Sequence, residues 1–219
     1  MIEFDKVSKS FWTKTQRKII LSEASFRVTL GKSMGILAPN GTGKTTLINM
    51  MANLEQPDEG TIRRTSRVSF PLGFMGGLKG SLTAAENCRF IADIYGIDPD
   101  YMEAYCRWIC ELGDYFEMPV NTYSSGMRAR LNFALLMAIE FDIYLIDESA
   151  PVTTDARFNM IIGKILKERL SRTTLVLVSH DPGIVERYCD CAAVLQNGKI
   201  HMFDSLAEAK RLYDYTKSS

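Results

Sequence analysis

Residues 38–45 read Ala38-Pro39-Asn40-Gly41-Thr42-Gly43-Lys44-Thr45, between a short apolar run and a segment of helical periodicity. This octapeptide is close to the pattern G-x-x-x-x-G-K-[ST], in which backbone N–H groups wrap a phosphate. The wrapping requires small residues, and Gly41 and Gly43 supply that freedom. The helix that follows directs the positive end of its dipole to the same place. The pattern therefore predicts a strand, a glycine-rich turn and a helix that bind a phosphate group together.

Individual roles follow from the chemistry of a nucleotide triphosphate. Lys44 brings a full positive charge to the β- and γ-phosphates, and the Thr45 hydroxyl is placed to ligate Mg²⁺. The first position of the pattern is Ala38 instead of glycine, which leaves the exact geometry of the loop open. We assign nucleotide contacts to the loop and the first turn of the helix: Pro39, Asn40, Gly41, Thr42, Gly43, Lys44, Thr45 and Thr46.

A second element, Ile143 to Glu148, is an apolar run that ends in two carboxylates. We expect Asp147 to hold Mg²⁺ through water. Glu148 stands one residue further along, where a carboxylate can polarise the attacking water as a general base.

The periodicity of the chain indicates an α/β fold with a helical segment inserted into it. Expected strands are Ile2–Val7, Ala24–Leu30, Ser33–Ala38, Ile143–Ile146 and Thr173–Ser179, followed by a hairpin of Ala192–Gln196 and Lys199–Phe203 around Asn197-Gly198. Expected helices are Thr45–Leu54, Ala84–Tyr95, Tyr101–Leu112 and Gly126–Ile139.

Composition limits the classes of function. The chain has 219 residues, 46% of them hydrophobic, with 26 basic and 26 acidic side chains. This balance gives no basic field that would attract nucleic acid, so we expect no nucleic-acid partner. We interpret the basic stretch Lys14–Lys18 as a solvated turn, and the five cysteines as buried thiols of a reducing cytosol. No signal peptide or membrane-spanning run of about 18 to 20 apolar residues is visible, so we expect another chain to supply any membrane span.

Two further motifs indicate the family. Tyr123-Ser124-Ser125-Gly126-Met127 opens a helix and resembles the LSGGQ signature of ABC ATPases, and Val178-Ser179-His180 resembles their switch histidine. The four motifs occur in the order and spacing of that family, and the resemblance covers the whole chain. It implies a P-loop (RecA-like) core with an antiparallel β subdomain and an inserted α-helical subdomain. We expect residues 1–75 and 140–219 to form the core and residues 76–139 the helical subdomain.

The resemblance also implies a dimer with two ATP molecules between its subunits. Ser124, Ser125 and Gly126 would serve the ATP of a second copy of the chain, and Asp155 would act in communication across that dimer. His180 would contact the γ-phosphate and hold the water together with Glu148. Phe11 matches the aromatic position that stacks on adenine, although a plain strand-end aromatic remains an alternative.

Finer details resemble the ATPases of capsular polysaccharide exporters, of the KpsT and BexA type. The segments concerned are Phe70–Thr83, Tyr123–Arg128 and Asp155–Phe158. This resemblance implies a position at the cytoplasmic face of the inner membrane on integral permease subunits. It also implies periplasmic adaptor and outer-membrane export proteins as further partners.

Departures from the family pattern leave alternatives open. No glutamine occurs between Gln56 and Gln196, so the glutamine that usually senses Mg²⁺ is missing, with Phe70 and Pro71 near its place. The stretch Ser149–Thr154 is about one residue longer than usual. The alternatives are an exporter of O-antigen or teichoic acid, a non-transport ABC ATPase of translation or DNA repair, and a degenerate ATPase that acts as a scaffold.

Overall fold

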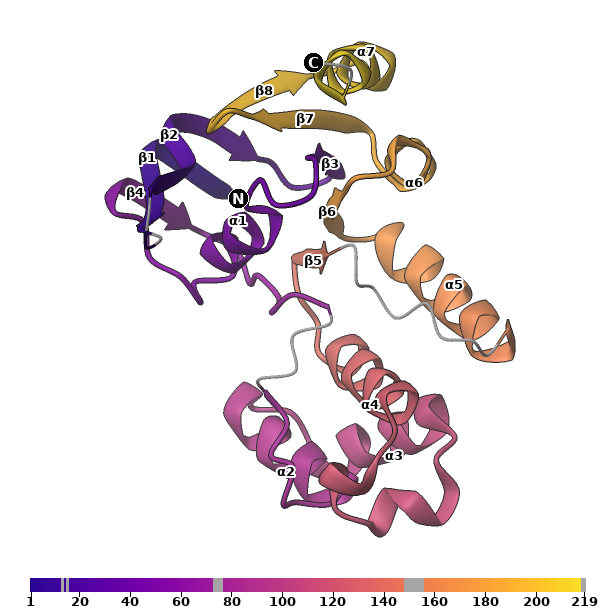
Figure 1. Cartoon of the computed structure of the whole chain (residues 1–219). Coiled ribbons are helices and arrows are strands. Elements are labelled where there is room, and N and C mark those ends of the chain that lie inside the picture. Colours follow the sequence, from indigo (N-terminus) through magenta and orange to yellow (C-terminus); the bar gives the residue numbers. More distant parts are fainter. Residues whose placement is uncertain (13, 15, 73–76, 148–155, 218–219) are drawn as a thin grey trace. The chain divides into compact units, whose positions relative to one another are not determined.

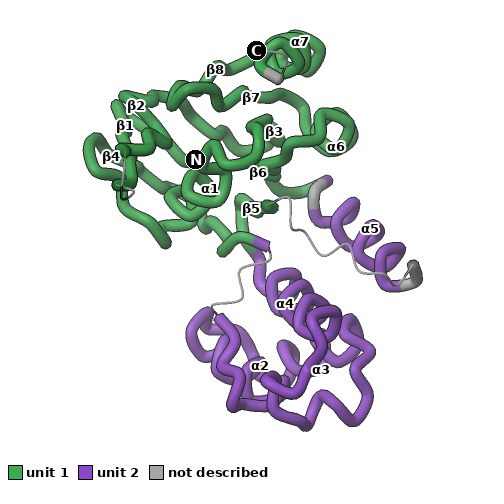
Figure 2. Tube along the Cα trace, in the orientation of Figure 1, with its two compact units in different colours: residues 1–71, 141–148, 172–219 green, residues 72–140, 149–171 purple. Residues whose placement is uncertain are grey.

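A computed structural model describes residues 1–12, 14, 16–72, 77–147 and 156–217 (Figure 1). The chain divides into two compact units (Figure 2). Unit 1 comprises residues 1–71, 141–148 and 172–219, and unit 2 comprises residues 72–140 and 149–171. The subdomain boundaries expected from the sequence stay predictions.

The centre of unit 1 is a five-stranded sheet in the order β5-β6-β3-β7-β8. Its first four strands are parallel, and β8 pairs antiparallel with β7. The bounds are Met34–Leu37 for β3, Ile143–Asp147 for β5, Thr174–Ser179 for β6, Cys191–Gln196 for β7 and Lys199–Phe203 for β8. The side chains of β3 and β6 are buried throughout, as expected for strands inside a parallel sheet. The predicted α/β class is confirmed.

A second, antiparallel sheet of unit 1 has the order β2-β1-β4. Its strands are β1 (Ile2–Trp12), β2 (Arg17–Val28) and β4 (Glu59–Arg64). Phe4 and Phe26 lie opposite each other in the register and stack with ring centroids 4.4 Å apart. Such cross-strand aromatic pairs stabilise a sheet beyond its backbone bonds.

Three expectations about this sheet were wrong, and one of its strands was not predicted. β1 continues five residues past Val7, and β2 begins at Arg17 instead of Ala24, because the two strands pair as far as Trp12 with Arg17. The supposed turn at 14–18 therefore includes the start of a strand. β4 was not predicted, because it is an edge strand in which Ile62 alone is apolar, and edge strands carry a weak hydrophobic signal.

Three helices belong to the described residues of unit 1. Helix α1 (Lys44–Met51) buries Leu47, Ile48, Met50 and Met51 in a core shared with strands of both sheets. Helix α6 (Pro182–Tyr188) contacts β3 and β6. Helix α7 (Leu206–Lys217) runs along β7 and β8 (Figure 1). Neither α6 nor α7 was predicted from the sequence.

Unit 2 is helical in its described part. It contains α2 (Ala84–Tyr95), α3 (Pro99–Cys110), α4 (Ser125–Ala138), α5 (Ala156–Leu170) and two 3₁₀ turns, Gly113–Glu117 and Val120–Thr122. The bounds of α2 agree with the prediction, because Thr83 and Glu86 form a capping box and Gly96 ends the helix with φ 66°. α3 begins two residues earlier than expected, because Asp98 caps it and Pro99 takes its first position.

The five cysteines are all buried and all carry free thiols. Within the part of the chain that the structure describes, no helix combines the length and the apolar character needed to cross a bilayer.

Candidate functional site

The loop between β3 and α1 leaves the first turn of the helix open. Gly43 is the N-cap of α1 with φ 108°, and no side chain caps the helix there. The Thr42 hydroxyl donates to the Pro39 carbonyl oxygen at 2.8 Å, which closes the loop on itself. The N–H groups at the start of α1 thus point into the loop, as a bound phosphate requires.

Glycine is required at position 43 for two reasons. Its positive φ disfavours other residues, and a Cβ atom there would lie 2.5 Å from Cγ2 of Ile20 on β2. Gly41 also has a positive φ, 78°, but a Cβ atom at that position would meet nothing within 4 Å. Ile20 of the antiparallel sheet therefore packs closely against Gly43, whereas no atom lies near the corresponding position of Gly41.

Alanine at the first position of the motif fits without strain. Ala38 is fully buried, and its N–H donates to the Ser179 carbonyl oxygen at 3.1 Å. Ala38 is not among the non-glycine residues with positive φ, so this backbone does not need glycine. The doubt that the sequence raised about the loop geometry is thereby removed.

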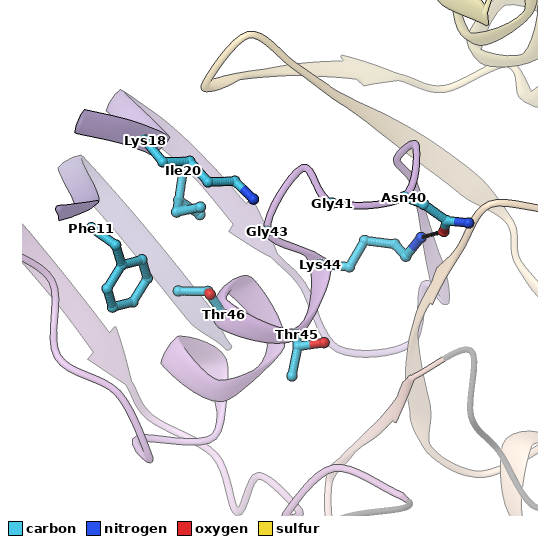
Figure 3. A pocket seen from close by; sticks show the side chains of 9 residues that line it. All are labelled: Phe11, Lys18, Ile20, Asn40, Gly41, Gly43, Lys44, Thr45 and Thr46. Carbon is cyan, nitrogen blue, oxygen red and sulfur yellow. Dashed lines mark hydrogen bonds between the residues drawn. The ribbon is translucent and has the colours of Figure 1, made fainter. Parts of the chain in front are cut away.

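The Lys44 ammonium is held across the mouth of the loop. Its Nζ donates to Asn40 Oδ1 at 2.8 Å (Figure 3). It also donates to the Ala38 carbonyl oxygen at 3.2 Å. These two neutral oxygens are partners that the oxygens of an anion over the loop could replace, because an ammonium binds charged oxygens more strongly.

Thr45 and Asp147 bring two oxygen atoms together beside the loop. Thr45 Oγ1 donates to Asp147 Oδ2 at 3.4 Å. Burial raises the pKa of the Asp147 carboxyl, against the lowering effects of the Thr45 hydrogen bond and the Lys44 charge. A half-buried carboxylate beside a hydroxyl is a donor set that fits a hard cation such as Mg²⁺. Glu148, the expected general base, lies outside the described residues.

A pocket of about 470 Å³ opens above this loop (Figure 3). Phe11, Lys18 and Ile20 of the antiparallel sheet line one side, and the loop and first turn of α1 line the other with Asn40, Gly41, Gly43, Lys44, Thr45 and Thr46. The Phe11 ring is 40% exposed. The structure therefore brings an accessible aromatic ring and the phosphate loop to one pocket, as an adenine nucleotide needs.

Phe11 is backed by a buried lysine that pairs with two carboxylates. Lys9 Nζ lies 5.1 Å from the ring centroid and contacts Glu55 Oε1 at 2.6 Å and Asp58 Oδ1 at 3.1 Å. The hydrogen bond that Lys9 donates to Glu55 is the main cause that raises the pKa of Lys9, so this ammonium stays charged. Lys9 itself is 8% exposed, so a buried cation lies against the Phe11 ring at the pocket.

Two pocket residues were missed from the sequence. Lys18 and Ile20 lie two residues apart on β2, and Lys18 pairs with Phe11 in the register. Figure 3 shows the Lys18 side chain extending from β2 toward the glycine loop. The β-branched pair Ile19 and Ile20 was the available strand signal, and the basic residues before it obscured that signal.

His180 follows the last residue of β6. Ser179 pairs with Leu37 of β3, and Asp147 of β5 pairs with Val178, so the carboxyl ends of three parallel strands lie at one edge of the sheet. The His180 side chain is exposed there. Ligands of open α/β sheets bind at such an edge.

The serine-glycine motif starts α4 in unit 2. The Ser124 hydroxyl accepts from the Met127 N–H at 3.2 Å and so caps the helix. Ser125 and Gly126 follow in the first turn, and Ser125 is exposed. Burial raises the pKa of Tyr123 to about 12, and its neutral hydroxyl donates to the Tyr115 carbonyl at 2.6 Å. The residue that precedes the Ser124 cap is therefore held in place by its own buried hydrogen-bonded side chain.

The segment where the family glutamine is missing continues from the edge of the parallel sheet. Val68 forms a parallel bridge to Ile143, and Ser69 Oγ accepts from the Leu145 N–H at 2.9 Å. Phe70 then packs edge-on against Phe141, with ring centroids 6.2 Å apart. Residues 73–76, the stretch 149–154 and Asp155 lie outside the described residues.

Comparison with known sequences decides the family. The sequence profile of the family described as "ABC transporter" matches residues 21–151, more than half of the chain. The chain belongs to the ABC transporter family. As an ATP-binding subunit of this family it is an ATPase.

Several ABC transporter proteins resemble the chain over nearly its full length. ATP-binding protein BexA of Haemophilus influenzae is 43% identical over 217 residues, 99% of this chain and 100% of BexA. The capsule polysaccharide export ATP-binding protein CtrD of Neisseria meningitidis serogroup B is 42% identical, covering 98% and 99%. Polysialic acid transport ATP-binding protein KpsT of Escherichia coli is 39% identical, covering 91% and 90%. The predicted resemblance to capsule-export ATPases is confirmed.

Solved ABC structures share the fold. The ATP-binding cassette MJ0796, in a dimeric post-hydrolysis state bound to ADP and Pi, superposes with a TM-score of 0.75 at 21% identity, covering 92% of this chain and 97% of the other. An ATP-binding subunit of an ABC transporter gives 0.79 at 21% identity, covering 98% and 99%. At this identity the likeness bears on the fold alone, and it confirms the predicted ABC ATPase fold.

Proposed function

We propose that this chain is the ATP-hydrolysing subunit of an ABC exporter of capsular polysaccharide. The observation that supports an ATP site is the pocket of about 470 Å³, which is lined by Phe11 on one side and by the glycine loop with Lys44 on the other. The printed functions of CtrD and KpsT, at 42% and 39% identity over most of the chain, support a capsular polysaccharide as the transported polymer.

Each residue of the pocket has a chemical task in this proposal. The adenine ring stacks on Phe11, and the open N–H groups from Gly43 onward bind the phosphates. Lys44 exchanges its bonds to Asn40 and Ala38 for the β- and γ-phosphates, since charged oxygens bind an ammonium more strongly than neutral ones.

Hydrolysis requires a positioned water and a base. Thr45 and Asp147 would hold Mg²⁺, which supplies charge stabilisation at the phosphates. We assign Glu148 the part of general base, and His180 the part of orienting the same water from the end of β6.

The assembly is a pair of these chains on integral permease subunits at the cytoplasmic face of the inner membrane. The exposed start of α4, with Ser125 and Gly126 beside the Ser124 cap, would meet the phosphates bound by the second copy. Asp155 would act across that dimer. Periplasmic adaptor and outer-membrane proteins would continue the route of the polymer.

The test of this proposal is affinity capture of the full chain from membranes, with identification of the co-purified integral protein and glycan. A permease and a capsular polymer are expected with the wild-type chain. Lys44→Ala should abolish nucleotide binding and export, whereas Lys199→Ala, an exposed lysine on β8, should leave both unchanged. Capture of an O-antigen or teichoic-acid precursor would refute the capsular substrate, and co-sedimentation with ribosomes instead of a permease would refute export.

Glu148→Gln separates binding from chemistry. The variant should bind ATP with wild-type affinity and lose turnover, because an amide cannot accept the proton of water. Full ATPase activity would reject Glu148 as the base.

A further inference from the structure

The carboxyl end of β6 is joined to helix α7 of unit 1 by a side-chain hydrogen bond. The Tyr213 hydroxyl on α7 donates to the His180 carbonyl oxygen at 2.8 Å. Tyr213 is 0% exposed, and α7 contacts β3, β7, β8 and α6. A buried hydroxyl directed at one backbone carbonyl is a specific contact, because it loses a good partner if that peptide turns away.

The same peptide unit is held from its other side. The Asp181 N–H donates to Ser179 Oγ at 3.0 Å, and Ser179 is 1% exposed. The carbonyl of His180 and the N–H of Asp181 belong to one planar group, so these two bonds fix its orientation. Since Ser179 is held in the ladder with β3, the direction of the His180 Cα–Cβ bond follows from the fixed backbone on either side.

This arrangement continues to the phosphate loop. The Ser179 carbonyl accepts the N–H of Ala38, the first residue of the loop, at 3.1 Å. Asp181 in turn accepts from the Gly183 N–H at 2.8 Å and caps α6. A continuous set of backbone and side-chain hydrogen bonds therefore joins α7, the histidine and the loop within unit 1.

We propose that Tyr213 is a positioning residue for ATP hydrolysis, which holds the backbone of His180 so that its imidazole faces the bound nucleotide. This inference rests on the proposed function, in which His180 orients the attacking water. It adds α7 to the hydrolytic machinery, although the sequence of that helix carries no recognisable motif.

The test compares Tyr213→Phe with Tyr215→Phe in the purified full chain. Both variants lose one hydroxyl from α7, but Tyr215 is 69% exposed. We expect kcat of Tyr213→Phe to fall about two- to tenfold, the effect of one neutral hydrogen bond, with KM for ATP unchanged. Tyr215→Phe should keep the wild-type kcat. A wild-type kcat in Tyr213→Phe overturns the inference.

A double variant separates positioning from general stability. In a His180→Ala background, Tyr213→Phe should cause no further loss of kcat, because the group that it positions is gone. An additional loss of the same size would show that the hydroxyl acts through the fold at large and would overturn the inference. Should Tyr213→Phe fail to fold, Ser179→Ala removes the other bond to the same peptide and is expected to lower kcat in the same way, and a wild-type kcat there overturns the inference.

Different results would refute the proposed role of His180 and the inference about Tyr213. If His180→Ala hydrolyses ATP like the wild type, the role of His180 is wrong and Tyr213 has nothing to position. If the kcat of His180→Ala falls and that of Tyr213→Phe stays at the wild-type value, the role of His180 stands and the positioning by Tyr213 is refuted.

Discussion

The contact between Ile20 and Gly43 can be measured by adding one methyl group to each glycine of the phosphate loop in turn. In Gly41→Ala and in Gly43→Ala the new residue must adopt a positive φ, 78° and 108° respectively, which costs about 1–3 kcal/mol. Only the methyl at position 43 also meets Ile20, with Cγ2 at 2.5 Å and Cδ1 at 2.9 Å. Overpacking of this kind costs about 1–3 kcal/mol more.

Gly43→Ala should therefore unfold at a lower temperature than Gly41→Ala. For a chain of this size the additional cost corresponds to a difference in Tm of about 2–12 °C. The measurement is thermal and urea unfolding of both variants without nucleotide. Gly41→Ala serves as the control, because it also places an alanine at a positive φ but without the close approach.

Removing Ile20 tests the cause directly. Ile20→Ala alone should destabilise the chain by about 2–5 kcal/mol. The double variant Gly43→Ala/Ile20→Ala should then be more stable than the sum of the two single changes predicts, because the methyl group occupies the space that Ile20 leaves. Equal unfolding free energies for Gly41→Ala and Gly43→Ala, or strict additivity in the double variant, would contradict the packing of β2 on the loop.

Three further predictions concern the same chain. Lys18→Met should raise the Kd for ATP about two- to fivefold, the size expected for an exposed charge, while Arg17→Met on the same strand should not; equal effects in a titration would remove Lys18 from the site. Asp147→Asn should raise Tm of the nucleotide-free chain at pH 8 and change it little at pH 3. Burial raises the pKa of Asp147, so the stability that its protonated form contributes below the unfolded pKa is lost as pH rises through the folded pKa, and an uncharged amide avoids this loss. A Tm gain that is independent of pH would reject this reasoning. Ser124→Ala should lower the free energy of unfolding by about 0.5–2 kcal/mol through loss of the cap of α4, whereas Ser125→Ala should leave it unchanged, and equal losses in urea unfolding would show that the cap is not specific.

Local sequence was sufficient wherever a pattern is written into neighbouring residues. The α/β class, the glycine loop, helix α2 and the hairpin of β7 and β8 were all predicted, because caps, tight turns and buried strands depend on short-range chemistry. The family was also predicted from four short motifs in order.

Only the tertiary structure decided which distant residues share the pocket and its supports. Lys18, Ile20 and Tyr213 carry no motif, and each reaches the site through a strand pairing or a helix that packs from far along the chain. Only the tertiary structure showed that alanine fits at position 38, because the hydrogen bond to Ser179 of β6 holds the loop backbone there in a conformation that does not need glycine. Sequence periodicity reports which face of an element is buried, but the partner that covers this face is set by the packing of the whole unit.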